Sequence, residues 1–535
     1  MRLSALFEGF ALLMLAGGAT GTITYANAQS STVSLQQFDP QCGRPGYNCR
    51  PAFQNAFAAL SRVGGGILQL PAGTFEVDFP EMPQNVRSGP LLDSKNLLLV
   101  PSNVIVQGTV AGNGTYESVI QWSNTSVPTF VFDNANHSGL KNLHLQFTGA
   151  MPTVFPYFDS HLQRSLGHKQ LYNQAGPYEL FSFVYALNSD YCVFDHLLFD
   201  SATHDNDHIF AVAINLKGKG VIENDGGGMS GLATGNTITN LQILDFDHGM
   251  VIAGQNNILV ENIKANRRGS TMAIPPGHVI YFTNLIRYDG TPPSLATSYI
   301  SSTNVTIRNV VEGPDTLSNV NSLGTLAIKY INGGIVDNVY SQHPEGLLQS
   351  VQQAQNVTFS NMTWSSDYPL CQNVPKNCLA AKIILRPSAT ATVPSKNLTF
   401  KNISLISTAE PILGIFFGAD DYVVDGLSIT TPPEFLQGQT SPNGIVQTQH
   451  SNHGTINHFT YTPLLTSYNP EGKYNSPISI AGKSSDVNAS VTINWPRGVP
   501  MPKTGSAIIT SAADNSDATQ VINTIAQTFA FGRRQ

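Results

Sequence analysis

The sequence predicts an all-β fold, a right-handed parallel β-helix in which short strands stack coil upon coil. Charged residues make up only 12% of the 535 residues while Gly (46) and Pro (32) are plentiful, which suits an extended all-β protein better than a helical one. In addition, a two-strand unit recurs, as in GMVIAGQNNILVENI: an apolar strand, a short turn, and a second strand of the pattern apolar-x-apolar-x-Asn-apolar. Stacked units of this kind would pair each strand with copies about 4.8 Å above and below it.

The first 28 residues are typical of a secretory leader. They contain one early arginine, an apolar stretch and Ala26-x-Ala28, the small-residue pattern of a cleavage site. We therefore expect removal of residues 1–28, a mature chain that starts near Gln29, and a secreted or periplasmic protein. An N-terminal membrane anchor is the alternative, but Glu8 interrupts the apolar stretch, and no later segment of the sequence could span a bilayer.

Five cysteines fit an oxidising compartment. Cys42 and Cys49 are close enough to close a small disulfide loop, as are Cys371 and Cys378, which leaves Cys192 inside an apolar strand as a buried thiol. Neither pair has the C-x2-C spacing of zinc sites. We expect no resident metal and no cofactor.

The chain is expected to form one domain, with the β-helix over residues 29–500. Residues 53–77 would cap its N-terminal end, because they join a helix, a GGG that ends it and a first strand. The apolar face of that helix is predicted to consist of Phe53, Phe57, Leu60 and Val63. Residues 501–535 would form a C-terminal cap or a tail.

Asn-x-Ser/Thr occurs at Asn304, Asn356, Asn397 and elsewhere. These residues fall at the same turn position of the repeat, so a structural role is the better explanation, and glycosylation is the alternative in a eukaryotic host.

A net charge of −7 and a pI near 6.0 argue against a nucleic-acid partner. A polyanionic partner would need a local basic patch. We expect no membrane association after leader removal, and the oligomeric state stays open.

The start of the chain resembles the pectate-lyase-like superfamily. The resemblance rests on the capping helix, the GGG-x-apolar-x-apolar-PAG-T segment that follows it, and VPSNVIVQG at 100–108. Polygalacturonases, rhamnogalacturonases, pectate lyases, sugar epimerases and phage tailspikes belong to this superfamily. The resemblance implies a parallel β-helix and says little about the reaction.

Polar residues precede the first strand of successive repeats, and side chains from successive coils can line one sheet. The segments are HDNDH-IFAVAI (204–214), DFDHG-MVIAG (245–254) and PPGH-VIYF (275–282), and a fourth, at 325–339, carries Lys329 within its strand. This alignment makes Ile209, Met250 and Val279 equivalent.

In order and spacing, these segments resemble the motifs N-T-D, D-D, G-H-G and R-I-K of glycoside hydrolase family 28, the polygalacturonase and rhamnogalacturonase group. The matching segments are Asn206-Asp207-His208, Asp247-His248-Gly249, Gly277-His278-Val279 and Ala327-Ile328-Lys329. The sequence departs from the motifs at His248, Val279 and Ala327. Since Ala327 replaces an arginine that would pair with a uronate carboxylate, Lys329 or the pair Arg267 and Arg268 would have to substitute.

The resemblance implies a secreted hydrolase that cleaves a glycan of the acidic, pectin type. An inverting hydrolase needs two carboxyl groups about 6.5 to 9.5 Å apart, one to protonate the leaving oxygen and one to activate water. We assign Asp247 as the acid and Asp207, with Asp205, as the base side. His248 and His278 would complete the catalytic group, His278 by tuning or relaying protons. The substrate-binding residues would be Asp205, Arg267, Arg268, Tyr281 and Lys329.

Two other functions stay open. A lyase or epimerase removes a proton beside a uronate carboxyl, and Arg267, Arg268, His278 and Lys329 offer the base and the charge neutralisation that it needs. A non-catalytic glycan-binding solenoid is favoured if the aligned acids point inward or bond only backbone groups. Tyr281 would support sugar binding in every case.

Several of these polar residues also have a structural interpretation. Asp at a β-helix turn usually binds backbone amides, so Asp245, Asp420 and Asp421 are expected to be structural. A metal site built from residues 204–208 is not expected, because these side chains would diverge along a turn and strand.

Overall fold

The computed structural model describes residues 31–79, 97–123, 128–150, 162, 166, 171–172, 181–204, 210–218, 231–266, 277–283, 285–288, 299–313, 324–342, 346–366, 383–385, 395–408, 412, 415–432, 445–449, 451–464, 477–481, 486–494, 508–510 and 527–529. The candidate residues Asp205, Asp207, Arg267 and Arg268 lie outside these ranges, as do the proposed leader and Cys371 and Cys378.

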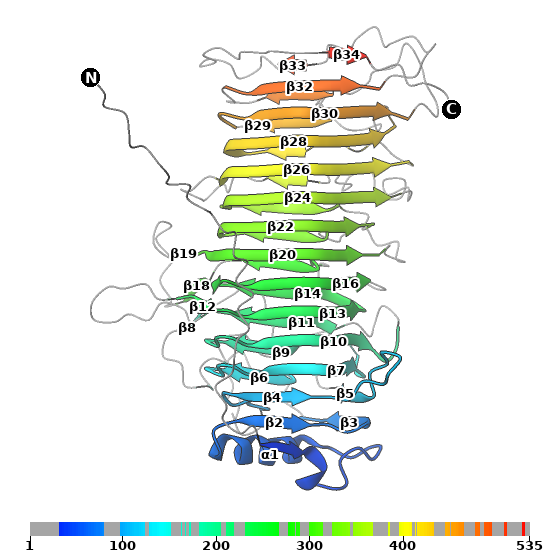
Figure 1. Cartoon of the computed structure of the whole chain (residues 1–535), viewed down its shortest axis with the longest axis vertical. Coiled ribbons are helices and arrows are strands. Elements are labelled where there is room, and N and C mark those ends of the chain that lie inside the picture. Colours follow the sequence, from blue (N-terminus) through cyan, green and yellow to red (C-terminus); the bar gives the residue numbers. More distant parts are fainter. Residues whose placement is uncertain are drawn as a thin grey trace, which may run out of the picture.

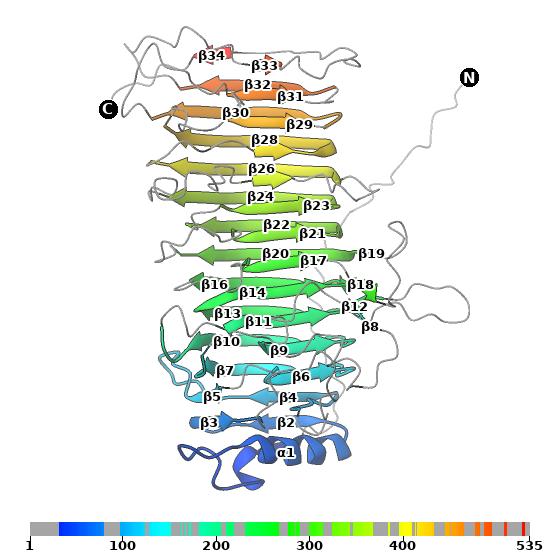
Figure 2. The ribbon, with the colours of Figure 1, turned by 180° about the vertical axis from the view of Figure 1, so that it is seen from behind.

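The chain forms a right-handed parallel β-helix, as predicted. Figures 1 and 2 show the strands stacked along one axis, from helix α1 at one end to β33 and β34 at the other. The strands form two long sheets, called sheet A and sheet B here, in which the paired strands are parallel. From β6 onward, each coil contributes one strand to sheet B and one or two strands to sheet A, so consecutive coils lie side by side.

Sheet A contains β1 (Thr32–Ser34), β2 (Gly66–Gln69), β3 (Gly73–Val77), β4 (Val104–Gln107), β5 (Ser118–Trp122), β7 (Gly139–Phe147), β10 (Val193–Ser201), β12 (Ala233–Thr234), β13 (Thr237–Leu244), β15 (Gln255–Asn256), β16 (Leu259–Asn266), β20 (Ser302–Glu312), β22 (Ile331–Ser341), β24 (Gln355–Ser366), β26 (Ser395–Ser407), β28 (Ala419–Thr431), β30 (Thr455–Pro463), β32 (Asn488–Ile493) and β34 (Gln527–Phe529).

Sheet B contains β6 (Phe130–Asp133), β9 (Ser182–Leu187), β11 (Phe210–Lys217), β14 (Phe246–Ala253), β17 (Ile280–Thr283), β21 (Leu326–Lys329), β23 (Leu348–Gln352), β25 (Ile383–Leu385), β27 (Ile415–Phe417), β29 (Val446–Gln449), β31 (Ile478–Ala481) and β33 (Ile508–Thr510). A small sheet beside the stack joins β8 (Leu171–Tyr172), β18 (Leu285–Tyr288) and β19 (Tyr299–Ile300) in antiparallel pairs.

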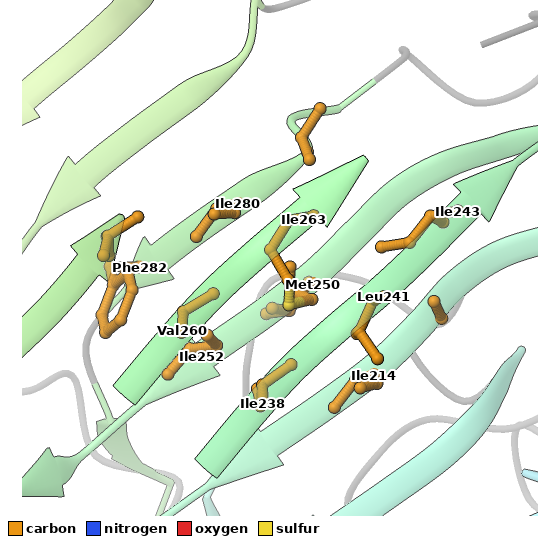
Figure 3. Close-up of a cluster of buried hydrophobic side chains, with 14 of the residues drawn as sticks. Ile214, Ile238, Leu241, Ile243, Met250, Ile252, Val260, Ile263, Ile280 and Phe282 are labelled. Carbon is orange, nitrogen blue, oxygen red and sulfur yellow. The ribbon is translucent and has the colours of Figure 1, made fainter. Parts of the chain in front are cut away.

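The core lies between the two sheets and consists of apolar columns that run along the stack. One column of sheet A is formed by Ile238, Val260, Ile307, Val336, Phe359, Phe400, Val424 and Ile456. The rings of Phe359 and Phe400 stack with centroids 4.8 Å apart. In Figure 3, residues of β16 face Met250 and Ile252 of sheet B across the interior. A shift of one residue would turn these apolar side chains outward, so their burial fixes the register.

The N-terminal cap is formed by a short 3-10 helix, η1 (Leu35–Gln37), and by helix α1 (Arg50–Arg62), which begins three residues before the expected start. Phe53, Phe57 and Leu60 are buried against the first coil, as predicted. The prediction for Val63 was wrong: it follows the helix, and its side chain is 66% exposed.

The structure contains Cys42, Cys49 and Cys192 as buried free thiols. Burial raises the pKa of the Cys192 thiol to about 12, as expected for a thiol in the core. The sulfurs of Cys42 and Cys49 interact with each other, and burial also raises the pKa of both thiols. A disulfide between them stays a prediction.

Short strands continue beyond residue 500. β33 pairs with β31, and β34 pairs with β32, so both sheets extend into the segment that was expected to hold only a cap or tail. Within the described part of the chain, no helix combines the length and apolar character needed to cross a bilayer.

Asparagine ladders link successive strands of sheet A at a left-handed bend within each strand. Asn240, Asn262 and Asn309 all adopt a left-handed backbone, with φ between 56° and 58°. Asn262 Nδ2 donates to Asn240 Oδ1 (2.9 Å), and Asn309 Nδ2 donates to Asn262 Oδ1 (3.0 Å). Asn tolerates this conformation better than most residues, which explains the recurrent Asn of the sequence repeat.

We predict that Asn262→Ala lowers the free energy of unfolding by about 1 to 3 kcal/mol, because it removes two ladder bonds and replaces Asn with a residue that tolerates the left-handed region less well. Asn262→Gly, which keeps the backbone accessible, should cost less. Chemical denaturation followed by circular dichroism measures both. Asn488→Ala, on an exposed side chain at the start of β32, is the control. Equal stability of Asn262→Ala and wild type would contradict the ladder's role.

Candidate functional site

The predicted site lies along one edge of sheet B, where the chain enters β14, β17 and β21. The register of these strands is set by the column Met250, Ile280 and Leu326. Counting back two residues from each member of this column places His248, His278 and Gly324 at equivalent positions on the three coils. Gly249 N donates to His278 O (2.9 Å), which confirms that the chains already lie side by side at this level.

The residue-by-residue alignment of the three strands that was predicted from the sequence was wrong. Met250 pairs with Ile214 and Ile280, not with Ile209 and Val279. Asp245, with a left-handed φ of 57°, separates β13 from β14, which begins directly after it at Phe246. Asp247 and His248 therefore lie within the strand instead of in the turn before it.

Asp247 and His248 form a buried pair. His248 Nδ1 lies 3.1 Å from Asp247 Oδ2, and Gly277 N on the next coil donates to Asp247 Oδ1 (3.1 Å). The Asp247 side chain is only 1% exposed. A carboxylate held in this way orients the histidine ring.

Gly277 is required by this packing. A Cβ at position 277 would lie 2.0 Å from His248 Nε2, well inside the ring's contact distance. The imidazole therefore rests on the backbone of the next coil, and any side chain at this position would displace it.

His278 continues the row on the next coil. Its Nδ1 lies 3.1 Å from the carbonyl oxygen of Gly324, and because a carbonyl only accepts, Nδ1 carries the hydrogen. In the neutral ring, Nε2 is then the basic nitrogen. Only 4% of His278 is exposed.

Tyr281 and Lys329 provide the more accessible surface of the site. The Tyr281 ring lies with its centroid 6.0 Å from that of His248 and 5.6 Å from that of His278. Lys329 Nζ lies over the same ring, 4.9 Å from its centroid. Both side chains are half-buried. The structure thus brings together Asp247, His248, His278, Tyr281 and Lys329, which are five of the nine predicted site residues.

Sequence reasoning missed a second histidine–carboxylate pair at the same edge. His204 Nδ1 lies 2.6 Å from Asp245 Oδ2, with the aspartate side chain fully buried and the histidine 45% exposed. Asp245 was expected to be structural, and its left-handed turn supports that role. The position of His204 in the HDNDH segment was the available signal.

The other predicted site residues stay predictions, because Asp205, Asp207, Arg267 and Arg268 lie outside the described residues. Among the residues that are described, no three His, Cys, Asp or Glu side chains converge as ligands for a metal ion.

The sequence matches no protein-family model and no curated protein. The structure is similar to the catalytic domain of Agl-KA, with 13% identity, coverage of 88% of this chain and 69% of that chain, and a TM-score of 0.51. Other similar structures are a DFA-IIIase from Arthrobacter chlorophenolicus (8% identity, 94% and 100% coverage, TM-score 0.49) and an N-terminal fragment of bacteriophage phi29 gene product 12 (12%, 90% and 70%, 0.49). The likeness to Agl-KA shows the shared fold. The narrower resemblance to glycoside hydrolase family 28 stays a prediction.

We predict that Gly277→Ala displaces the His248 ring and abolishes its contact with Asp247, with only a modest loss of stability. The His248 ring signals in nuclear magnetic resonance (NMR) spectra report the displacement. Gly112→Ala is the matched control, because nothing lies within 4 Å of a Cβ at that position. Unchanged His248 signals in Gly277→Ala would show that the ring does not rest on this glycine.

Proposed function

We propose that the protein is an enzyme that processes an acidic polysaccharide bound along sheet B. The observation that carries the proposal is the row of His248 and His278 on adjacent coils, each with Nδ1 held by an acceptor, beside the half-buried Tyr281 and Lys329. Acid–base groups, an aromatic ring and a cation are what such a reaction needs. A substrate of this kind is compatible with the proposed export of the chain.

Lys329 is the proposed partner of a uronate carboxylate. Its ammonium group lies over Tyr281, so a sugar ring that packs on or beside the tyrosine would bring its carboxylate within reach of the lysine. This position compensates for Ala327, which stands where the polygalacturonase motif has an arginine.

The burial of Asp247 favours elimination or epimerisation as the reaction. Both of its oxygens are engaged, one by Gly277 N and one by the His248 ring, so the carboxyl is poorly placed to protonate a leaving oxygen directly. We propose that Asp247 orients His248 and that a histidine removes the proton beside the uronate carboxylate. Lys329 would stabilise the charge that develops, and in elimination a second acid would protonate the departing oxygen.

Hydrolysis by paired carboxyl groups is the second candidate. It is favoured by the order and spacing of the segments that resemble glycoside hydrolase family 28, with Asp247 as the acid and Asp207 as the base. A non-catalytic glycan-binding role is less favoured, because the Asp247 carboxylate contacts a histidine ring as well as a backbone amide.

The purified protein should act on a glycan in a panel of pectic and other acidic polysaccharides. Reducing ends together with ultraviolet absorbance of unsaturated uronate would indicate elimination. Reducing ends alone would indicate hydrolysis, and a change in the proton NMR spectrum without cleavage would indicate epimerisation. Absence of all three changes on every substrate would contradict an enzymatic function on these glycans.

We expect His248→Gln and Asp247→Asn to lower the turnover number by about 10² to 10⁴, the usual contribution of a positioned acid–base group. Asp247→Asn can still accept from Gly277 N but no longer favours the same histidine tautomer. Asp425→Asn is the matched control, because Asp425 binds His458 (2.6 Å) on the outer surface of sheet A. Full activity of a folded Asp247→Asn variant would exclude both proposed roles of Asp247. An equal loss in Asp207→Asn would favour hydrolysis.

Lys329→Met should raise KM about tenfold or more for a uronate polymer, because hydrogen bonds to charged groups contribute roughly 1.5 to 3 kcal/mol. The same variant should bind a carboxyl-reduced, neutral form of that polymer as wild type does. Lys401→Met, an exposed lysine on sheet A, is the control. An equal effect on charged and neutral polymers would show that Lys329 does not recognise the carboxylate.

A further inference from the structure

We propose that Glu312, a carboxyl residue buried in the interior of the solenoid, is a positioning residue that acts on His278 through Thr325. The catalytic consequence rests on the proposed function, whereas the positioning itself does not. No feature of the sequence pointed to this residue.

Glu312 lies in the interior of the solenoid. It is the last residue of β20, its side chain is fully buried, and its neighbours in the column are Ala265 on one coil and Ser341 on the other. A carboxyl group is costly to bury unless it is hydrogen-bonded, so its presence among core side chains calls for a specific partner.

The partner is Thr325, which lies at the far end of the segment that connects β20 to β21. Thr325 Oγ1 donates to Glu312 Oε2 (2.5 Å), and Ser341 Oγ lies 2.6 Å from the same threonine oxygen. All three side chains are fully buried. Because Glu312 ends β20 and Thr325 immediately precedes β21, this bond ties together the two ends of the segment that connects sheet A to sheet B.

The hydrogen bond between Glu312 and Thr325 also anchors the backbone of residues 324 and 325, which contacts His278. Thr325 N donates to Gly346 O (3.0 Å), and Thr325 O accepts from Ile280 N (3.2 Å). The preceding carbonyl, that of Gly324, is the partner of His278 Nδ1.

Gly324 cannot by itself maintain this carbonyl orientation. Its φ of 82° lies in the region open to glycine, where the backbone has more than one accessible conformation. The Thr325 N–H lies in the same peptide plane as the Gly324 carbonyl. The bond from this N–H to Gly346 O and the anchored Thr325 side chain therefore together set where the Gly324 carbonyl points, and hence which nitrogen of His278 carries the hydrogen.

The test is the tautomer of His278 in the full-length protein, measured by NMR with labelled histidine and assigned with a His278→Gln variant. Wild type should carry the hydrogen on Nδ1. Thr325→Val and Glu312→Ala should give a mixture of tautomers, because the Gly324 carbonyl is released. Glu312→Gln, which keeps an acceptor for the Thr325 hydroxyl, should retain the wild-type tautomer.

Thr431→Val is the matched control. Thr431 is also a buried threonine whose hydroxyl bonds across coils, accepting from Ile412 N (2.9 Å), but it lies remote from this site at the end of β28. It should destabilise the fold without altering His278. If Thr325→Val folds and His278 keeps its wild-type tautomer, the inference is overturned.

Activity provides the second readout. On a responsive glycan, Thr325→Val should lose about tenfold to a hundredfold in turnover, part of the 10² to 10⁴ that a positioned acid or base contributes, with little change in KM. A tautomer shift in a protein inactive on every glycan would support the positioning role and reject the proposed function. A loss of activity without a tautomer shift would overturn the positioning role alone.

Discussion

The lateral register of the parallel strands is the constraint on which the whole site depends. His248, His278 and Gly324 are far apart in sequence, yet each lies two residues before one member of the column Met250, Ile280 and Leu326. Adjacent coils are separated by about 4.8 Å, so side chains at one level of the stack are contact neighbours. A slip of one residue in the strand pairing would move the apolar column from the core face to the outer face, and it would turn the side chains of the site to the opposite face as well. The free energy that buries the core therefore also holds the candidate catalytic groups in their positions.

Buried carboxyl groups lie where connecting segments meet the strands of this regular stack. Asp245 binds His204 ahead of β11, Asp247 binds Gly277 as the chain returns to β17, and Glu312 binds Thr325 as it returns to β21. Each bond joins the scaffold to an end of a connecting segment. A buried carboxylate is stable only when its oxygens are hydrogen-bonded, so each such residue demands a defined geometry from the chain end that it contacts. The repeat forms the regular strands, and these carboxyl groups hold the ends of the connecting segments in defined positions beside the site.

The sequence was informative where a residue's role depends on its own repeat and uninformative where it depends on another coil. The period-two pattern identified the strands, because this signal is local. The recurrent Asn was assigned to turns, but it marks left-handed bends inside the strands of sheet A. Phe53, Phe57 and Leu60 were found by helical spacing, whereas Val63 fits that spacing but lies beyond the end of the helix. The register of β14 was predicted wrongly because the strand begins at Phe246, directly after the left-handed Asp245, and not after the polar segment. Glu312 escaped notice because its partner, Thr325, is a neighbour only after the coil has closed.

A histidine beside an aspartate does not by itself indicate catalysis in this fold. His458–Asp425 and His196–Asp195 are such pairs on the outer surface, where their histidines are 83% and 55% exposed. Exposed pairs of this kind contribute little and restrict neither partner strongly. In the pair of Asp247 and His248 the side chains are 1% and 5% exposed, and the backbone of the next coil holds the carboxylate. Desolvation strengthens the electrostatic coupling, and the second contact removes the freedom of the carboxylate to turn away. The ring of His248, beside the half-buried Tyr281 and Lys329, therefore has a defined orientation that the histidines of the surface pairs lack.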